Sequence, residues 1–259
     1  MVTKINNLTV PHNLNNKKMI DKMNSNKVIS KIAGFGYLVI FISGFFSNFF
    51  VLESLIVPGD AATTANNIVA SEWLFRIGIF SFIIMVIFDV VLAWALYVLL
   101  RPASKNLSLL AAWFRLVNAT IFGIALQNLF SILQILSGAD HLTVLETGQM
   151  QTHVMLFLDK FNDTWLIGLV FFGIHLFILG YLIFKSTYIP RILGIFLIIA
   201  SLGYLIDSFA NFLLPSYTNY QEIFMLIVVV PGIVGELSLT FWLLLKGVKD
   251  NQPATRKAG

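Results

Sequence analysis

The chain has 259 residues, of which 58% are hydrophobic and only 12% are charged, with a mean hydropathy of +0.84. Soluble globular domains are roughly a quarter charged, so this composition excludes a freely soluble protein. The sequence contains no cysteine, which excludes disulfide scaffolds, thiolate metal sites and cysteine nucleophiles.

Residues 1–30 and 249–259 are polar segments at the two ends of the chain. The first is rich in asparagine and lysine and has too little apolar surface to fold alone, so we predict a disordered cytoplasmic tail. It also lacks the apolar stretch of a cleavable signal peptide. We therefore expect a single membrane domain between the two tails, over residues 31–248.

Six apolar runs divide this domain, and each is long enough to cross a bilayer as a helix, which takes about 20 residues. We therefore predict an all-α polytopic membrane protein, a bundle of six transmembrane helices. The predicted helices cover residues 32–52, 77–100, 107–136, 165–184, 192–214 and 223–245.

The basic residues gather on one side of this predicted bundle. Fourteen of the 17 lysines and arginines lie before the first run, after the sixth run, or in the connections after the second and fourth runs. Only Arg76 and Lys160 lie in the opposite connections, and Arg115 lies within a run. Cytoplasmic loops are enriched in Lys and Arg, so we predict that both termini are cytoplasmic. The net charge of +4 then reflects topology and attraction to anionic lipids, not nucleic-acid binding.

The connection after the first run carries local helix signals. Asp60 precedes a stretch rich in alanine and threonine and is predicted to cap a short interfacial helix. Ser71 is a candidate N-cap for the second transmembrane helix. Glu72 and Arg76 follow it four residues apart, a spacing at which opposite charges pair on a helix.

Several short motifs occur together along the domain. They lie at residues 57–68 (VPGDAATTANNI), 71–72, 75–76, 100–102, 172–175, 180–182, 189–194 and 203–207. As a set they resemble the bacterial integral-membrane family catalogued as domain of unknown function 4386. The resemblance covers residues 31–248 and implies a multi-helix protein of the bacterial inner membrane. It implies no reaction, substrate or catalytic residue.

Two opposite charges interrupt the second and third runs. Asp89 lies eleven residues before Leu100, and Arg115 lies eight residues after Leu107. At 1.5 Å per residue they are about 16 and about 12 Å from the predicted cytoplasmic face, close enough in depth to pair. Such intramembrane charges are costly and mark functional sites by default. Mutual neutralisation is one interpretation, and a substrate-binding or gating pair is the other.

His175 and Glu236 reach a similar depth, and Asn118 lies one helical turn from Arg115. We therefore predict a buried polar layer of Asp89, Arg115, Asn118, His175 and Glu236. Because histidine titrates near neutrality, such a layer is suited to relaying protons. The alternative for His175 is a packed histidine hydrogen-bonded to a neighbour.

The sixth run has features that point to Glu236. Pro231, Gly232 and Gly235 precede it, and a proline leaves the carbonyl four residues earlier without its donor. A broken helix that lines a binding site is one interpretation, and a simple proline kink is the other. Since an acid facing lipid is costly, we predict that Glu236 faces protein or water, with His175 as its partner.

A second polar group is predicted at the level of the outer membrane face. Asp207 lies in the outer third of the fifth run and either pairs with Arg76 or faces an outer vestibule. The whole candidate cluster comprises Glu72, Arg76, Tyr204, Asp207 and Asn211.

The longest predicted connection spans residues 137–163, and its apolar stretch at residues 154–158 is expected to lie on the membrane surface. A metal site formed by the histidines and acids of this connection is an alternative interpretation, but their spacing matches no compact metal site. They are Asp140, His141, Glu146, His153, Asp159 and Asp163.

Recognised catalytic motifs are absent from the sequence, including the G-x-S-x-G elbow, H-E-x-x-H and the phosphate-binding loop. We therefore expect no catalytic residue, cofactor or metal. The expected partners are membrane lipids. The leading functional hypothesis is a non-enzymatic small transporter or permeation protein with an unidentified small-molecule or ion cargo. An accessory or signalling protein with charges that only specify helix packing is the alternative, and a membrane-embedded enzyme comes third.

Overall fold

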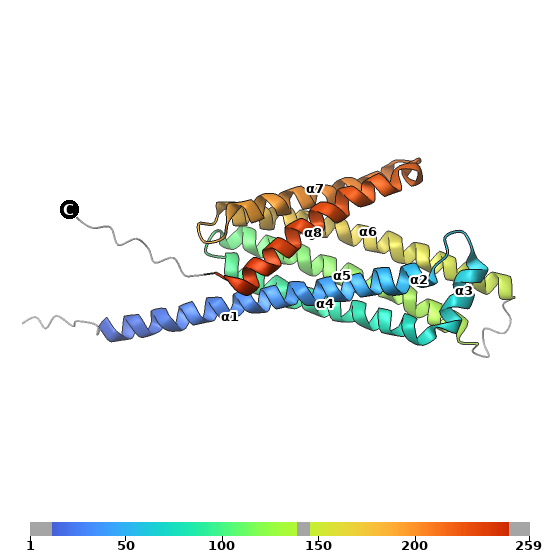
Figure 1. Cartoon of the computed structure of the whole chain (residues 1–259), viewed down its shortest axis with the longest axis horizontal. Coiled ribbons are helices and arrows are strands. Elements are labelled where there is room, and N and C mark those ends of the chain that lie inside the picture. The colour runs from blue at the N-terminus through green and yellow to red at the C-terminus, as the bar shows by residue number, and fades with distance from the viewer. Residues whose placement is uncertain (1–11, 139–145, 249–259) are drawn as a thin grey trace, which may run out of the picture.

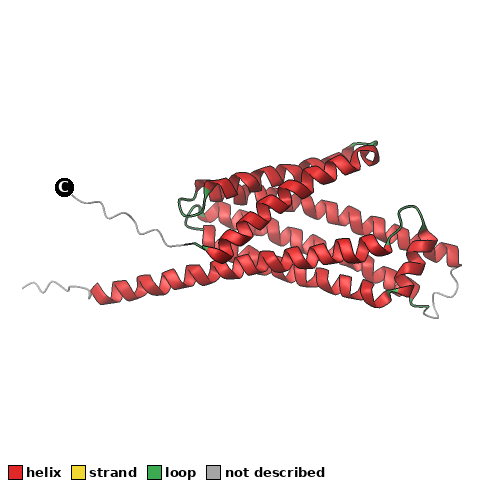
Figure 2. Cartoon of the chain, viewed as in Figure 1, coloured by secondary structure: helices red, strands yellow, loops and turns green. Residues whose placement is uncertain are grey.

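The computed structural model describes residues 12–138 and 146–248, with side chains from Ser25 onward, and these residues form helices joined by loops (Figures 1 and 2). Six helices are long and apolar enough to cross a membrane, so the predicted all-α, six-span architecture is confirmed. The elements are α1 (His12–Phe45), η1 (Phe46–Leu52), α2 (Glu53–Leu55), α3 (Ala61–Ala70), α4 (Glu72–Leu100), α5 (Lys105–Leu136), α6 (Thr147–Lys185), α7 (Arg191–Leu213), η3 (Tyr217–Tyr220) and α8 (Gln221–Leu245).

Helix α1 begins twenty residues before the predicted span and extends beyond the bundle (Figure 1). The prediction of a disordered tail is therefore wrong for residues 12–30. This segment contains no proline or glycine, the two residues that most strongly disfavour a helix interior, so the helix of the apolar run can continue through it. Residues 1–11 and 249–259, the remainder of the two predicted tails, lie outside the described residues.

Helix α6 also begins much earlier than predicted. Glu146 and Gln149 form a capping box at its start, and the helix then runs without interruption to Lys185. Val154, Leu158 and Phe161 lie on one face and are buried in the same core as residues of α3 and α5. The predicted piece on the membrane surface is therefore wrong, because the 3.6-residue spacing of these side chains lets them join the core.

The short helix α3 begins as predicted. The Asp60 carboxylate accepts a 2.9 Å hydrogen bond from the backbone N–H of Thr63. This bond, with a second from the Thr63 hydroxyl, lowers the pKa of Asp60. Ser71 precedes α4, but its side chain makes no capping hydrogen bond, so that prediction is wrong. The predicted ion pair between Arg76 and Glu72 is present at 2.6 Å on the surface.

The core divides into two clusters along the bundle. The cluster nearer the start of α1 and the end of α8 includes Tyr37, Leu92, Leu176, Leu197 and Leu239, so α1, α4, α6, α7 and α8 all contribute. The cluster at the opposite end contains buried residues of η1 and α2 through α6, and among the described residues α7 and α8 add none. Helices α7 and α8 therefore contribute to the apolar core at one end only.

Close helix crossings hold α8 at the packed end. A Cβ atom placed on Gly34 of α1 would lie 2.7 Å from Leu244 of α8, and the Val248 N–H donates a hydrogen bond to Ser30. From this crossing α8 diverges from α1 toward the other end of the bundle (Figure 1). Small residues permit such close approach between membrane helices.

Candidate functional site

Arg115 of α5 forms an ion pair with Asp89 of α4 in the middle of the bundle. The Arg115 Nη2 and Asp89 Oδ1 atoms are 2.6 Å apart, and the two side chains are 0% and 3% exposed. The predicted contact between these residues is thus formed. Each charge neutralises the other, which offsets part of the large cost of removing both from water.

His175 of α6 links this pair to the backbone of α5. Its Nδ1 atom lies 2.8 Å from the carbonyl oxygen of Ala111, and its Nε2 atom lies 3.1 Å from Arg115 Nη1. A carbonyl only accepts and a guanidinium only donates, so Nδ1 carries the proton and Nε2 accepts. The geometry therefore assigns a neutral imidazole. A proton added at Nε2 would face the N–H donor of Arg115, so the geometry makes His175 a positioning residue for Arg115.

Two aromatic rings flank the guanidinium of Arg115. Its Cζ atom lies 5.3 Å from the ring centroid of Tyr37 and 5.5 Å from that of Phe172, both within cation–π range. Together with Asp89 and His175, the rings hold the charge of Arg115 at one place in the bundle.

Glu236 of α8 makes a different contact from the predicted one. The hydroxyl of Tyr204 on α7 donates a 3.0 Å hydrogen bond to Glu236 Oε1, whereas His175 contacts Arg115 instead. The expected pairing of Glu236 with His175 is therefore wrong. Depth along a helix does not determine which neighbour a side chain reaches, because that also depends on the rotation of each helix about its axis.

Helix α8 is continuous through Pro231, so of the two interpretations of this proline the broken helix is wrong, and the proline lies within an intact helix. The neighbouring glycines have a packing role. A Cβ atom on Gly232 would lie 3.0 Å from the Tyr204 hydroxyl oxygen, and one on Gly235 would lie 3.1 Å from the carbonyl oxygen of Phe196. These glycines let α7 approach closely enough for Tyr204 to reach Glu236.

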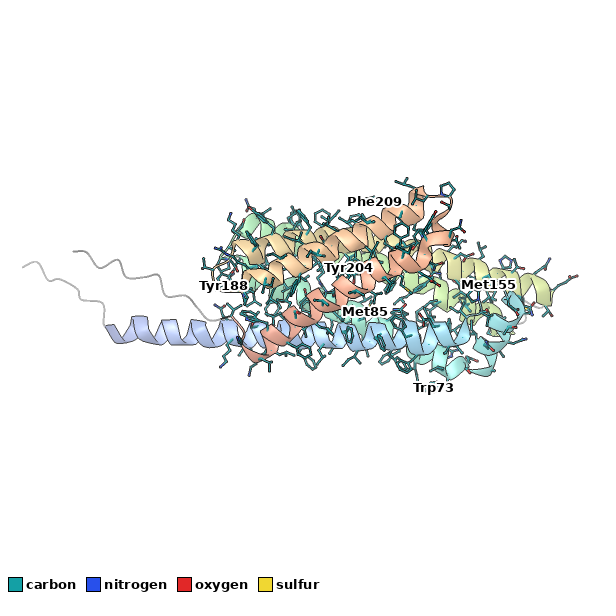
Figure 3. The ribbon with its side chains drawn as sticks, turned by 45° about the horizontal axis from the view of Figure 1, so that its top comes forward. Trp73, Met85, Met155, Tyr188, Tyr204 and Phe209 are labelled. Carbon is teal, nitrogen blue, oxygen red and sulfur yellow. The ribbon has the colours of Figure 1, made fainter. Side chains whose placement is uncertain are left out.

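A cavity of about 460 Å³ adjoins these residues and extends away from the packed end of the bundle. Asp89, Asn118 and Glu236 supply polar groups to its lining, and exposed Glu53 lies at its far end. Figure 3 shows two further lining residues, Tyr204 and Met85, near the middle of the bundle. The aromatic wall consists of Tyr37, Phe41, Phe45, Phe49, Phe122, Trp165, Phe172 and Tyr204.

Two buried polar side chains of this cavity have no hydrogen-bond partner among the described residues. Both amide atoms of Asn118 are unpaired although the residue is 0% exposed, and the Tyr37 hydroxyl is unpaired at 2% exposure. Leaving such groups without a partner costs about 1–3 kcal/mol each. Their presence in the cavity lining is what a site for a polar ligand group requires.

The sequence matches the family described as Domain of unknown function (DUF4386) over residues 32–247. The chain belongs to this family. An uncharacterized protein of Archaeoglobus fulgidus is 38% identical to it over 174 residues, which cover 67% of this chain and 83% of that protein. No solved structure matches the chain. Because this relative is archaeal, the bacterial membrane inferred from the sequence motifs stays a prediction.

The predicted outer polar cluster does not exist as a cluster in this DUF4386 protein. Arg76 pairs with Glu72, whereas Asp207 accepts a 2.7 Å hydrogen bond from the Tyr217 hydroxyl. Of the two alternatives for Asp207, the pair with Arg76 is therefore wrong. Asn211 also lies beside Tyr217. Helix α7 packs against α6 and α8, which keeps Asp207 away from the start of α4.

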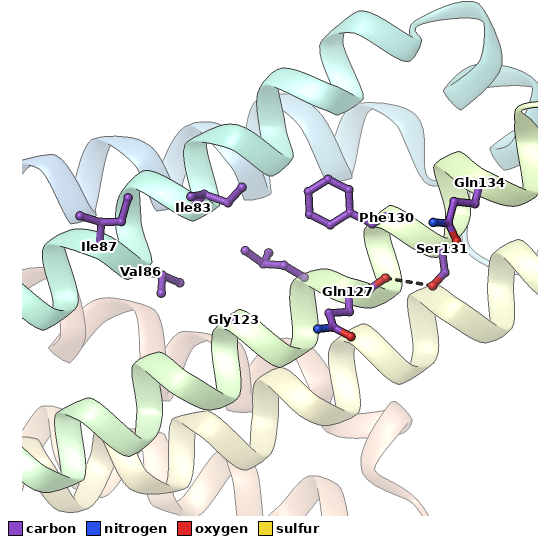
Figure 4. Close-up of a pocket in the computed structure, with 9 residues that line it drawn as sticks. Ile83, Val86, Ile87, Gly123, Gln127, Phe130, Ser131 and Gln134 are labelled. Carbon is purple, nitrogen blue, oxygen red and sulfur yellow. Dashed lines mark hydrogen bonds between the residues drawn. The ribbon is translucent and has the colours of Figure 1, made fainter.

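A second hollow of about 570 Å³ opens between α4 and α5, on a different part of the DUF4386 bundle (Figure 4). Its polar lining comes from Gln127, Ser131 and Gln134, and the Ser131 hydroxyl donates a 3.0 Å hydrogen bond to the carbonyl of Gln127. It contains no charged side chain, so the polar cavity is the stronger candidate for function.

Sequence reasoning missed two features of the site. Tyr37 and the aromatic wall lie within apolar runs, where nothing distinguishes a cavity-lining ring from a lipid-facing one. The sequence predicts Tyr204 in the outer polar cluster, whereas its hydroxyl donates a hydrogen bond to Glu236. Among the side chains that the structure describes, in residues 25–138 and 146–248, no three histidines or acids group as a metal site. Asp140 and His141 of the weakly predicted metal site lie outside the described residues.

Proposed function

We propose that this DUF4386 protein binds a small amphipathic molecule in the polar cavity and moves it between the bilayer and the aqueous side remote from the chain termini. The observation that carries the proposal is a cavity with an apolar aromatic wall and a polar end. The polar head of such a molecule can form hydrogen bonds with groups at the polar end of the cavity. These groups are the unpaired Asn118 amide, the unpaired Tyr37 hydroxyl and the Glu236 carboxylate.

The shape of the cavity supports movement as well as binding. Tyr37 and Glu53 both line the cavity and lie sixteen residues apart along the chain. At 1.5 Å per helical residue this separation is about 24 Å, which is more than half the thickness of a bilayer. The core at the packed end closes the cavity on the side of the termini. An opening on one side is one of the two states that an alternating-access transporter requires.

The alternative that the buried charges only specify helix packing is favoured for only part of the site. Asp89, Arg115 and His175 bind one another and the Ala111 carbonyl, so their main contacts are internal to the protein. Asp89 also lines the cavity, but its carboxylate is neutralised by Arg115, whereas Glu236 and Asn118 line the cavity without an ion-pair partner. We infer that the first three residues form a fixed charged base and that the last two contact the ligand.

Binding in the cavity is tested by quenching of Trp165, which lies in its wall. The protein, with its other four tryptophans changed to phenylalanine, is placed in nanodiscs and titrated with the neutral probe 11-bromoundecanol. We expect saturable quenching, because a bound probe brings bromine next to the indole ring. Quenching that rises linearly with the probe in the bilayer would contradict the proposal.

Two neighbouring residues of α8 provide a matched control. Val229 lines the cavity, whereas Val230 does not and is 54% exposed. Val229→Phe fills the cavity and is expected to weaken probe binding at least tenfold. Val230→Phe makes the same chemical change outside the cavity and should leave binding unchanged.

We also propose that both termini are cytoplasmic. The start of α1 and the end of α8 lie at the same end of the bundle, as the contact between Ser30 and Val248 requires. The excess of lysine and arginine there supports the cytoplasmic side. Reporter fusions after Gly259 and within residues 138–146 should report opposite sides of the membrane. A C-terminal reporter on the outer side would refute this orientation.

A further inference from the structure

We propose that the cavity takes a lipophilic organic cation and that this cation and a proton occupy the carboxylate of Glu236 in turn. The inference rests on the proposed function, because it assigns the chemical class of the amphipathic ligand.

The sign of the ligand follows from the charges of the cavity. Its lining contains three acids, Glu53, Asp89 and Glu236, and no lysine, arginine or histidine. Asp89 is neutralised by Arg115, which lies behind it. Glu236 has no basic nitrogen within 4.0 Å in the described part of the chain. The polar end of the cavity therefore has an acidic group that remains for a ligand or a proton to neutralise.

The walls select the form of that cation. A compact, strongly hydrated ion would lose its water in a cavity lined mainly by apolar side chains. A cation with a delocalised or shielded charge has a much smaller desolvation cost. Aromatic rings such as those of Phe41, Phe172 and Trp165 attract it through cation–π contact. A volume of about 460 Å³ is within the range of sites for drug-sized organic molecules.

Charged and titratable groups reach Glu236 from several packed helices. Tyr204 of α7 donates to it, Arg115 of α5 attracts it, and Asp89 of α4 repels it. Tyr37 of α1 lines the same end of the cavity. His175 of α6 is held by Arg115 and Ala111 in its neutral form and adds no charge. Glu236 is thus the group whose proton the cation replaces.

The exchange conserves charge. When the cation binds to the neutral carboxyl group, the proton of that group leaves to water and the carboxylate pairs with the cation. When a proton returns, the cation is released. Binding should therefore weaken as pH falls, by about tenfold per pH unit below the titration of Glu236, because one proton competes with one cation.

The test uses tetraphenylphosphonium, a permanent cation that carries no exchangeable proton, with the full chain in nanodiscs at several pH values. We expect saturable binding that weakens at low pH, and the release of about one proton per cation in weakly buffered solution at the pH where Glu236 is protonated. Binding without any pH dependence or proton release would overturn the exchange.

Variants of two acids on α8 separate the site from general charge effects. Glu236→Gln is expected to weaken cation binding at least tenfold and to remove its pH dependence, while Glu236→Asp retains both. Glu222→Gln alters an exposed acid outside the cavity and should leave binding unchanged. Full, pH-dependent binding by Glu236→Gln would overturn the assignment.

The neutral bromoundecanol probe distinguishes the two proposals. Its binding by Glu236→Gln shows that the cavity of this variant is folded. If the wild-type protein binds the neutral probe but not tetraphenylphosphonium, the cation inference fails and the proposed function stands. If it binds neither, both fail.

Discussion

Asp89→Asn is expected to lower the free energy of unfolding by about 3–5 kcal/mol, because it leaves the charge of a fully buried arginine without its partner. The double variant Asp89→Asn/Arg115→Gln removes both charges and should be closer to the wild type than the single variant is. Unfolding of the purified protein by a denaturing detergent, followed by circular dichroism, gives the three values.

The exposed pair of Glu72 and Arg76 is the matched control. Its side chains are 53% and 48% exposed, so Glu72→Gln should cost no more than about 0.5 kcal/mol. If the losses of Asp89→Asn and Arg115→Gln simply add in the double variant, the two residues are not energetically coupled and the charged base of the site is wrong.

Gly180→Ala should destabilise the protein by about 3 kcal/mol, near the upper end of the usual penalty for overpacking. A Cβ atom there would lie 2.6 Å from the carbonyl oxygen of Gly194, and one on Gly194 would lie 2.5 Å from that of Gly180. Helices α6 and α7 thus touch through their backbones, which cannot move aside as a flexible side chain does. Thermal unfolding in detergent measures the loss.

Gly123→Ala makes the same change on α5, where a Cβ atom would meet no other atom within 4 Å. It should cause no loss of stability, since alanine favours a helix more than glycine by about 1 kcal/mol. Equal losses for Gly123→Ala and Gly180→Ala would show that the crossing of α6 and α7 does not depend on the missing side chain.

The two stability predictions concern different parts of one arrangement. The pair of Asp89 and Arg115 connects α4 with α5, and His175 adds α6 through its contact with Arg115. The contacts of Gly180 with Gly194, and of Gly203 with the Ile227 carbonyl, join α6 to α7 and α7 to α8. Glu236 therefore reaches the charged base through a series of close helix contacts, and shifting any of them should alter the cavity.

Local chemistry determined much of this fold from the sequence. Runs such as residues 77–100 have to be helical and membrane-spanning, because a bilayer core provides no water for an unpaired backbone group. Asp60 and the pair of Glu72 and Arg76 depend on neighbours within one helical turn, so their contacts were also predictable. Equal depth and opposite charge together predicted the contact between Asp89 and Arg115, since buried opposite charges at one level have few other ways to be neutralised.

Only the tertiary structure decided which side chains meet between helices and where the bundle is hollow. The partner of Glu236 is Tyr204 and not His175, and Asp207 binds Tyr217 and not Arg76, because helix rotation and crossing angle select among residues of equal depth. Similarly, the apolar residues at 154–158 predicted a segment on the membrane surface, because the sequence does not show that α3 and α5 provide a core for Val154 and Leu158. The cavity follows from the divergence of α8 from α1, a packing geometry set by contacts such as that of Gly34 with Leu244, distant in sequence.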